Sequence, residues 1–258
     1  MTDDRHPVTR LATHTDDELY YRDTPLVAEL MGNATFTEAM FAHILGRTPG
    51  RGEVKILDAV LVTLMEHGLT PSAIATRLTY HSAPEALQAA VAAGLLNVGS
   101  QFVGTMENAA LLLRRLLDDK NAFEKVAQRE IADHRARRDP LPGFGHHLHK
   151  PDDPRTSRLF EIARAESKIA GTYIDALKRL SGIVDTMIGK HLTINATGAV
   201  AAVLMEIGVA PKIMRGFAVI SRAAGLVAHI SEEQSDPAAR TIWDTVEEAV
   251  PYAGNAPK

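Results

Sequence analysis

The chain has 258 residues, of which 45% are hydrophobic and 23% charged, and it contains no cysteine. This length can bury a large core without a metal or disulfide, and the lack of cysteine excludes a disulfide framework, thiolate catalysis and cysteine-bound zinc or iron-sulfur sites. The formal net charge of -4 argues against a general affinity for nucleic acid or an anionic membrane, so a polyanionic ligand would need a local basic pocket.

The first twenty residues carry several carboxylates and no long apolar run, which predicts no secretory signal. The longest weakly polar segment, residues 217–230, contains Arg222 and His229 and is shorter than the roughly 20 residues that a membrane span needs. We therefore expect a cytoplasmic protein with no membrane partner and no nucleic-acid partner.

Apolar residues recur at spacings of three and four over residues 53–66, which indicates an amphipathic helix. Ser82 and Glu85 fit a capping box ahead of a second helix that runs to Leu96. The same periodicity predicts helices over residues 106–118, 121–137, 156–181, 197–208 and 211–234. No alternating run of β-branched residues lies between turn signals, so the chain is predicted to be nearly all helical.

Alanine and glycine are frequent inside the predicted helices, as in residues 196–202 and 223–228, which favours close packing of helix on helix. Residues 139–155 are the least helical interior stretch because prolines and glycines interrupt them. We predict a loop there, and polar loops on a rigid scaffold are candidate sites. The tail, residues 251–258, is predicted to be loose.

The loop contains the sequence GFGHHLHK at residues 143–150. Its glycines let backbone amides approach a ligand, and imidazoles exchange protons near neutral pH. A solvated loop rich in histidine would show the same pattern. A metal site formed by His146, His147 and His149 is a poorer interpretation, because adjacent histidines rarely converge on one ion.

Two polar residues lie beside apolar segments. His67 follows the first predicted helix, where a cation would complement the helix dipole. Arg222 lies in a helix suited to burial and needs an anionic partner, because an unpaired buried charge is costly. That partner is a carboxylate either of the protein or of a substrate. The sequence contains no P-loop, dinucleotide glycine fingerprint, serine elbow or HExxH motif.

Five segments in this order resemble the citrate synthase superfamily, most closely its citryl-CoA lyase branch, which includes the lyase module of ATP-citrate lyase. They are residues 57–72, 94–104, 143–146 with 153–155, 194–198, and 221–229. The resemblance implies an all-α, citrate synthase-like fold with the site in the cleft between a large and a small helical domain. We expect residues 1–112 and 223–258 to form the large domain, with the dimer interface, and residues 113–222 the small domain.

The resemblance also implies a reaction. The family makes or breaks a carbon-carbon bond between the α-carbon of an acyl-CoA and the carbonyl carbon of a keto acid. Coenzyme A thioester is a substrate, and neither a metal nor a permanently bound cofactor is expected. A homodimer or a higher homo-oligomer is expected because the family completes its site with a residue from the neighbouring subunit.

Roles follow from the matched motifs. His67 is similar to the histidine that contacts the keto acid, and His146 to the one that hydrogen-bonds its carbonyl or hydroxyl oxygen. Arg155, Arg222 and Arg240 resemble the arginines that hold substrate carboxylates, a task that suits the bidentate guanidinium. The residues expected to flank the thioester and the adenosine end of CoA are Gly143, Phe144, Gly145, Lys150 and Asn195, and the nearest basic candidates for the CoA phosphates are Arg137, Arg138 and Lys150.

Three positions depart from citrate synthase. Phe102 replaces a histidine, and the lyase branch also has phenylalanine there, which favours a lyase. Thr197 stands where both branches have the catalytic aspartate that exchanges the proton on the acyl-CoA α-carbon. A hydroxyl cannot act as a general base near pH 7, and losing such a group typically lowers the rate about 10²- to 10⁴-fold. His147 replaces an arginine of the substrate-binding loop.

We interpret the sequence as a citryl-CoA lyase-like carbon-carbon lyase that cleaves citryl-CoA, or a related 3-hydroxyacyl-CoA, to acetyl-CoA or another short acyl-CoA and oxaloacetate or another 2-keto acid. His146 and His67 would supply the base and the stabilisation of the enolate. Water, His147 or an unidentified residue would protonate the departing carbon. Two alternatives stay open: a lyase or condensing enzyme for a different acyl-CoA, and a non-catalytic CoA-ester sensor.

Overall fold

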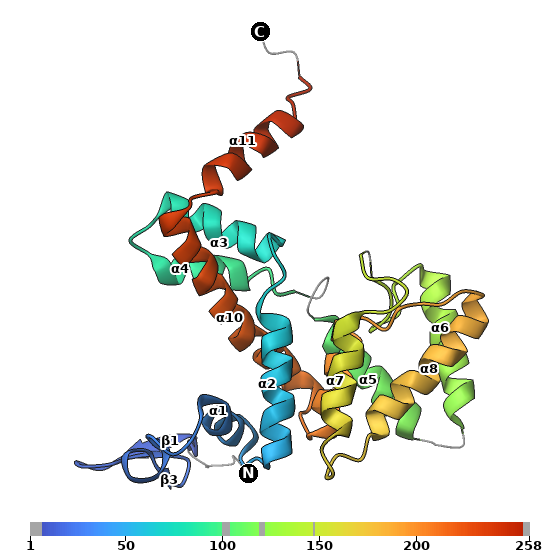
Figure 1. Ribbon diagram of the computed structural model, residues 1–258, viewed down its shortest axis with the longest axis horizontal. Coiled ribbons are helices and arrows are strands. Elements are labelled where there is room, and N and C mark those ends of the chain that lie inside the picture. Colours follow the sequence, from blue (N-terminus) through green and yellow to red (C-terminus); the bar gives the residue numbers. More distant parts are fainter. Residues whose placement is uncertain (1–6, 100–103, 119–121, 147, 255–258) are drawn as a thin grey trace, which may run out of the picture. The chain divides into compact units, whose positions relative to one another are not determined.

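The computed structural model describes residues 7–99, 104–118, 122–146 and 148–254 (Figure 1). The chain divides into two compact units, Met1–Asp58 and Ala59–Lys258. Helices make up 65% of the structure, which confirms the predicted all-α class. The predicted division into large and small helical domains stays a prediction. Phe102 and His147 lie outside the described residues.

The first unit contains a small antiparallel sheet and one α-helix. Its strands are β1 (Ala12–His14), β2 (Leu19–Tyr21) and β3 (Thr24–Pro25), in the order β1-β2-β3. A π-helical turn, η1 (Leu26–Leu30), follows, and then α1 (Phe36–Leu45), which begins at a capping box between Thr35 and Glu38. None of these elements was predicted. Strands of two or three residues are too short to show an alternating pattern.

The chain enters the second unit along α2 (Arg51–Met65). The described helices that follow are α3 (Pro71–Ser82), α4 (Leu87–Leu95), α5 (Thr105–Asp118), α6 (Phe123–Arg137), α7 (Pro154–Arg164), α8 (Thr172–Ile188), α9 (Ala196–Glu206), α10 (Pro211–Ser235) and α11 (Ala239–Ala249). One group consists of α3, α4 and α10, which contact one another, and α11 contacts α3 (Figure 1). In another group, α5, α7 and α8 each contact α9.

Helix α9 lies at the centre of the second group. Its residues from Ala199 to Leu204 are all buried, and most of them are alanine or valine. At the start of the helix, a Cβ on Gly198 would lie 2.6 Å from the carbonyl oxygen of Gly143. The absence of a side chain at Gly198 therefore lets the loop before α7 and the start of α9 come together.

Helix α10 is longer than the apolar segment that the sequence singled out. Its 25 residues are long and apolar enough to cross a membrane by length and composition, and half of the most apolar window is buried inside the protein. The helix contacts α3, α4 and α5 and buries Arg222, His229 and Glu233. Burial of charged groups against other helices is the pattern of a core helix.

Two predicted features are wrong. Residues 156–181 form two helices, α7 and α8, and Gly171 precedes α8 with a left-handed φ of 77°. Ser82 and Glu85 form no capping box, because Ser82 is the last residue of α3 and α4 follows Ala86 without a side-chain cap. Helix α3 itself, which starts at Pro71, was not predicted.

Candidate functional site

The loop between α6 and α7 is fixed against the segment that leads into α9. Gly143 and Gly145 have φ angles of 87° and 82°, which favour glycine. The carbonyl oxygen of Gly143 accepts from the amide of Asn195 at 3.0 Å, and the amide of Gly145 donates to the carbonyl of Thr193 at 2.8 Å. Phe144, between the glycines, is buried. Backbone pairing therefore holds the loop from Gly143 to Gly145 against the segment that leads into α9.

Asn195 links this loop to α9. Its Oδ1 accepts from the amide of Gly198 at 3.0 Å and so caps the helix, and its Nδ2 donates to the carbonyl of Gly145 at 3.0 Å. The side chain of Asn195 thus joins the start of α9 to Gly145, and both residues were predicted to flank CoA. They lie together, as expected if they form one side of a binding site.

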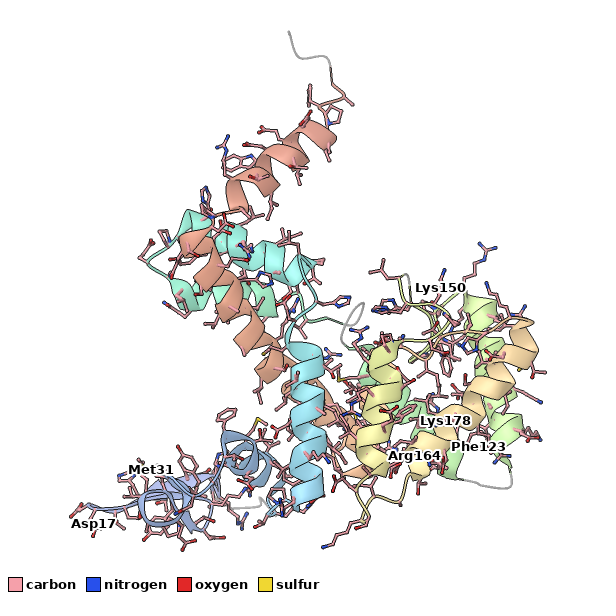
Figure 2. All side chains as sticks on the ribbon, in the orientation of Figure 1. Asp17, Met31, Phe123, Lys150, Arg164 and Lys178 are labelled. Atoms are coloured by element: carbon pink, nitrogen blue, oxygen red, sulfur yellow. The ribbon has the colours of Figure 1, made fainter. Side chains whose placement is uncertain are left out.

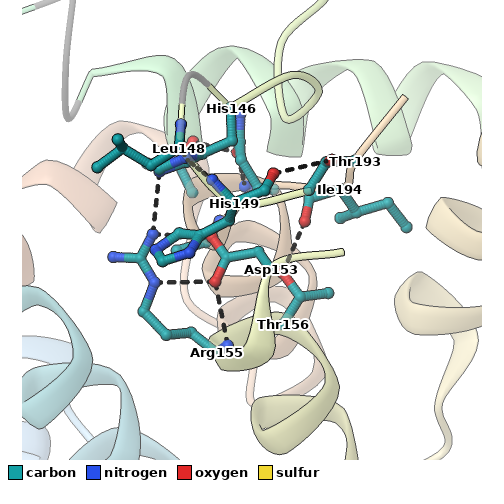
Figure 3. A network of polar contacts seen from close by, with 12 residues as sticks. His146, Leu148, His149, Asp153, Arg155, Thr156, Thr193 and Ile194 are labelled. Atoms are coloured by element: carbon teal, nitrogen blue, oxygen red, sulfur yellow. Dashed lines mark hydrogen bonds and ion pairs between the residues drawn. The ribbon is translucent and has the colours of Figure 1, made fainter. Parts of the chain in front are cut away.

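His146 is oriented by the backbone of its own loop (Figure 3). Its Nδ1 accepts from the amides of Leu148, at 3.1 Å, and of His149, at 2.9 Å. Its Nε2 lies 3.3 Å from Nη2 of Arg155. The ring of His149 is stacked beside it, with 4.4 Å between centroids. The loop therefore fixes the imidazole with Nε2 beside a guanidinium.

Arg155 is held in turn by Asp153 (Figure 3). Its Nε donates to Oδ1 at 2.9 Å and its Nη2 to Oδ2 at 2.8 Å. Asp153 is fully buried, caps α7 and also accepts from the amide of Ala196 at 3.1 Å. Burial alone would raise the pKa of this carboxyl, but the hydrogen bonds and charge of Arg155 outweigh it and hold the pKa below its usual value. Asp153 therefore stays ionised and orients Arg155.

One group of potential metal ligands lies here. Ligand atoms of His146, His149 and Asp153 lie within 4.8 Å of one another. However, Nδ1 of His146 already accepts two amide hydrogens, and both oxygens of Asp153 accept from Arg155. The nearby guanidinium would also repel a cation. These atoms are therefore poor metal ligands, and the Arg155 guanidinium beside them suits an anionic ligand instead.

His67, from another part of the second unit, lies close to His146. Its ring centroid lies 6.3 Å from that of His146, with the planes at 87°. The sequence placed His67 at a helix end, and α2 does end two residues earlier, at Met65. The two histidines predicted to act on one substrate are thus brought together.

Arg222 lies beside the turn that carries His67. It is 7% exposed, and it donates to the carbonyl of Met65 at 3.1 Å and to the hydroxyl of Thr70. Oε2 of Glu66 lies 3.7 Å from its Nη1. Burial lowers the pKa of Arg222, and the charge of Glu66 opposes this effect. A protein carboxylate is therefore present, although its distance from Arg222 exceeds that of a hydrogen bond.

Thr197 is hydrogen-bonded on both sides. Its hydroxyl donates to Oδ1 of Asn195 at 2.7 Å, and the hydroxyl of Thr105 donates to it at 3.0 Å. Thr105 was not among the predicted site residues. The hydroxyl pair lies on the first turns of α5 and α9, next to the loop that precedes His146.

Arg240 is not brought into this cluster by contacts in the described part of the chain. It lies on α11, with its side chain 64% exposed, and pairs with Asp244 at 2.9 Å. Arg137 pairs with Asp139 at 3.1 Å, and Arg138 ends α6 with a φ of 57°. Lys150 lies on the loop beyond His146 (Figure 2). The role of these residues in binding stays a prediction.

Sequence reasoning missed three residues that hold the site. Asp153 carries a recognisable signal, since an acidic residue before Pro154 is typical of a helix start. Thr105 carries no such signal, because its partner Thr197 is distant in sequence, and neither does the contact of Glu66 with Arg222.

The comparisons with known proteins agree with this architecture. The family described as the citrate synthase C-terminal domain matches residues 18–243. The structure of citryl-CoA lyase from Hydrogenobacter thermophilus has a TM-score of 0.85 and 32% identity, and the match covers 98% of this chain and 97% of that one. The structure of Methanosaeta concilii ATP citrate lyase with (3S)-citryl-CoA has a TM-score of 0.76 over 98% of this chain and 43% of its own. At 17% identity, the second match shows the fold alone.

Curated relatives are more distant. The 2-methylcitrate synthase of Shewanella oneidensis is 25% identical over 224 residues, which cover 83% of this chain and 58% of that protein. The probable ATP-citrate synthase subunit 1 of Neurospora crassa is 24% identical over 251 residues, which cover 89% and 36%. The chain thus spans about half the length of the curated relatives it matches, or less.

Proposed function

Because the chain belongs to the citrate synthase family, we propose that it is a carbon-carbon lyase of the citryl-CoA lyase type. Its substrate would be citryl-CoA or a related 3-hydroxyacyl-CoA, and its products acetyl-CoA, or another short acyl-CoA, and oxaloacetate or another 2-keto acid. The observation that carries the proposal is the cluster of His146, Arg155 and Asp153, with His67 at 6.3 Å from His146. The citryl-CoA lyase match over almost the full length of both chains supports the same choice.

The cluster suits a retro-aldol cleavage. His67 is the proposed base: it takes the proton of the 3-hydroxyl, and the O–H electron pair becomes the new carbonyl bond as the adjacent carbon-carbon bond breaks. The electrons of that bond pass to the thioester enolate, which then takes up a proton at carbon. In this proposal, Nε2–H of His146 donates to the hydroxyl oxygen, because Nδ1 already accepts from two amides, and Arg155 binds a carboxylate of the keto-acid half.

The last proton transfer needs a group other than Thr197. Its hydroxyl hydrogen is directed to Asn195, and a hydroxyl is neither a strong acid nor a base near pH 7. Water or His147 is the proposed donor. Cleavage with a slow final protonation is therefore the expected behaviour with citryl-CoA.

The formation of oxaloacetate from citryl-CoA tests the proposed cleavage. Purified protein is incubated with citryl-CoA, and oxaloacetate is detected through coupled malate dehydrogenase. Turnover that exceeds that of His146→Ala supports the proposal, and equal rates reject citryl-CoA as the substrate.

A second candidate rests on Thr197. Retained arginines with a replaced aspartate fit a lyase or condensing enzyme for a different acyl-CoA, or a non-catalytic CoA-ester sensor. The match to a 2-methylcitrate synthase supports testing substrates with an added methyl group. A screen of 3-hydroxyacyl-CoAs separates the first case from citryl-CoA cleavage. Calorimetric binding of acetyl-CoA without turnover of any candidate would favour the sensor.

We also propose that the protein is a homodimer or a higher homo-oligomer and lies in the cytoplasm. Helix α11 supports the dimer, because its one described buried residue is Ala239, whereas Trp243, Val246 and the following Val250 are exposed. Analytical ultracentrifugation and cell fractionation test these two statements independently of activity.

A further inference from the structure

One face of α10 lies against the end of α2 and carries Arg222, Gly225 and His229. Their spacings of three and four align them along that face. A Cβ on Gly225 would lie 2.1 Å from the carbonyl oxygen of Met65 and 3.1 Å from Oε2 of Glu66. Glycine therefore allows α10 to approach the turn that carries His67, with Arg222 and His229 on either side of the closest point.

One carboxylate oxygen of Glu66 contacts the turn that carries His67, and the other faces α10. Its Oε1 accepts from the amides of His67, at 2.7 Å, and Gly68, at 2.6 Å. Its Oε2 lies 3.1 Å from Nε2 of His229 and 3.7 Å from Nη1 of Arg222. Burial would raise the pKa of Glu66, but these amide and imidazole contacts and the Arg222 charge lower it overall. The carboxylate thus holds the His67 turn while it faces two nitrogen groups of α10.

Arg77 sets which nitrogen of His229 carries the proton. Nε of Arg77 donates to Nδ1 of His229 at 3.1 Å. A guanidinium N–H can only donate, so Nδ1 carries no hydrogen and the ring proton is on Nε2, which faces Glu66. Nε2 lies 3.1 Å from Oε2 of Glu66, close enough for an electrostatic contact, although its geometry is not that of a hydrogen bond. Arg77 is 2% exposed and is itself held by Glu233 at 2.7 Å and by Glu232.

We propose that His229 is a positioning residue that keeps the Glu66 carboxylate on the His67 turn and away from the guanidinium of Arg222. The inference rests on the proposed function for its kinetic consequence. Without the His229 N–H, Oε2 of Glu66 moves toward Arg222, because opposite charges attract strongly in a partly buried site. Such a pair would withdraw Oε1 from the His67 turn and occupy the cation that is predicted to bind a substrate carboxylate.

Two isosteric variants separate the partners of His229. In His229→Gln, the side-chain amide can reach the position of Nε2 and donate to Glu66. In His229→Asn, the shorter side chain can replace Nδ1 as an acceptor for Arg77 but does not reach Glu66. Gln234→Ala is the matched control, since Gln234 is exposed on the same helix and donates to the hydroxyl of Tyr80.

The first measurement needs no catalysis. Backbone NMR of the full chain reports the amide resonances of His67 and Gly68, which shift when they lose a carboxylate acceptor. We expect both resonances to move in His229→Asn and to stay near their wild-type positions in His229→Gln and Gln234→Ala. Unchanged resonances in His229→Asn, or equal changes in the Asn and Gln variants, would overturn the inference.

The second measurement is the kinetics of citryl-CoA cleavage. We expect His229→Asn to raise KM about tenfold, which corresponds to about 1.4 kcal/mol, with kcat within about twofold of wild type. His229→Gln should restore KM. A fall in kcat at constant KM contradicts a positioning role. If the wild-type protein does not cleave citryl-CoA, the proposed function fails, and the amide resonances still decide the role of His229.

Discussion

Thr105 and Thr197 form a hydroxyl pair with 3.0 Å between their oxygens, next to the loop that carries His146. The orientation of Asn195 fixes the direction of this pair. Its Oδ1 accepts from Gly198 and its Nδ2 donates to Gly145, so Thr197 must donate to Oδ1 and accept from Thr105. The position where the family resemblance implies an aspartate therefore offers a hydroxyl, which cannot act as a general base near pH 7.

Restoring a carboxylate at this position should accelerate turnover. In Thr197→Asp, the hydroxyl of Thr105 would donate to the new carboxylate, whereas Oδ1 of Asn195 would repel it. We therefore expect kcat for citryl-CoA to rise about 10²-fold, the lower end of what a general acid or base contributes. Steady-state assays of Thr197→Asp and of Thr197→Val, which removes the hydroxyl, make the comparison. No gain in the aspartate variant would favour the alternative substrates or the sensor.

The close contact between α10 and α2 predicts a difference between two glycines of the same helix. Gly225→Ala would place a Cβ 2.1 Å from the carbonyl of Met65, so it should destabilise the fold by about 1–3 kcal/mol, the typical cost of overpacking. Gly216→Ala meets only the flexible end of Ile213, 3.6 Å away, and should stabilise the helix by up to about 1 kcal/mol. Denaturant unfolding measures both, and similar midpoints for the two variants would argue against this packing.

Asp153 should make the free energy of unfolding fall at acidic pH, because its pKa is lowered in the folded protein. Its folded pKa lies below the usual 3.8, so its contribution is fully present above that value and is lost as the pH falls through the lower, folded pKa. We expect Asp153→Asn to lower stability at pH 7 and to flatten the loss of stability below about pH 4. Denaturant unfolding at several pH values tests this. An unchanged acid profile in the variant would show that other carboxyls dominate.

His191 should make stability depend on pH in the opposite direction, because its pKa is raised in the folded protein. It lies 2.6 Å from Asp185 and 3.1 Å from Asp152, and these carboxylates raise its pKa above 6.5. The contact of His191 with Asp185 and Asp152 links α8 to the His146 loop. Its contribution to stability is therefore fully present below pH 6.5 and is lost as the pH rises through the higher, folded pKa of His191. We expect the opening of the Leu192 amide, which is bonded to Asp185, to increase with pH in wild type. After correction for intrinsic exchange rates, hydrogen exchange in His191→Gln should lose this dependence.

Several parts of the fold could be predicted from periodicity. An apolar stripe predicted a helix over residues 106–118, and the structure has one over Thr105–Asp118. The interruption between α7 and α8 escaped prediction, because residues 165–170 include good helix formers and the left-handed Gly171 marks the new start. The strands of the first unit were too short to leave a pattern.

The candidate site also contains residues that local sequence motifs predict and residues that they do not. His67, His146 and Arg155 belong to local motifs from which the sequence predicts one site, and the structure brings their side chains together, while their roles stay predictions. The groups that hold them depend on long-range packing. Arg77 and His229, for example, are 152 positions apart, and nothing in either segment alone predicts their hydrogen bond. Charge networks of this kind appear only once the helices are assembled.

The appearance of oxaloacetate from citryl-CoA is the most direct measure of whether this cluster breaks a carbon-carbon bond. The wild-type chain should release oxaloacetate and acetyl-CoA in equal amounts, and His146→Ala should abolish that release while it retains the fold. Release of coenzyme A and citrate without oxaloacetate, or equal oxaloacetate from both proteins, would contradict the proposed lyase.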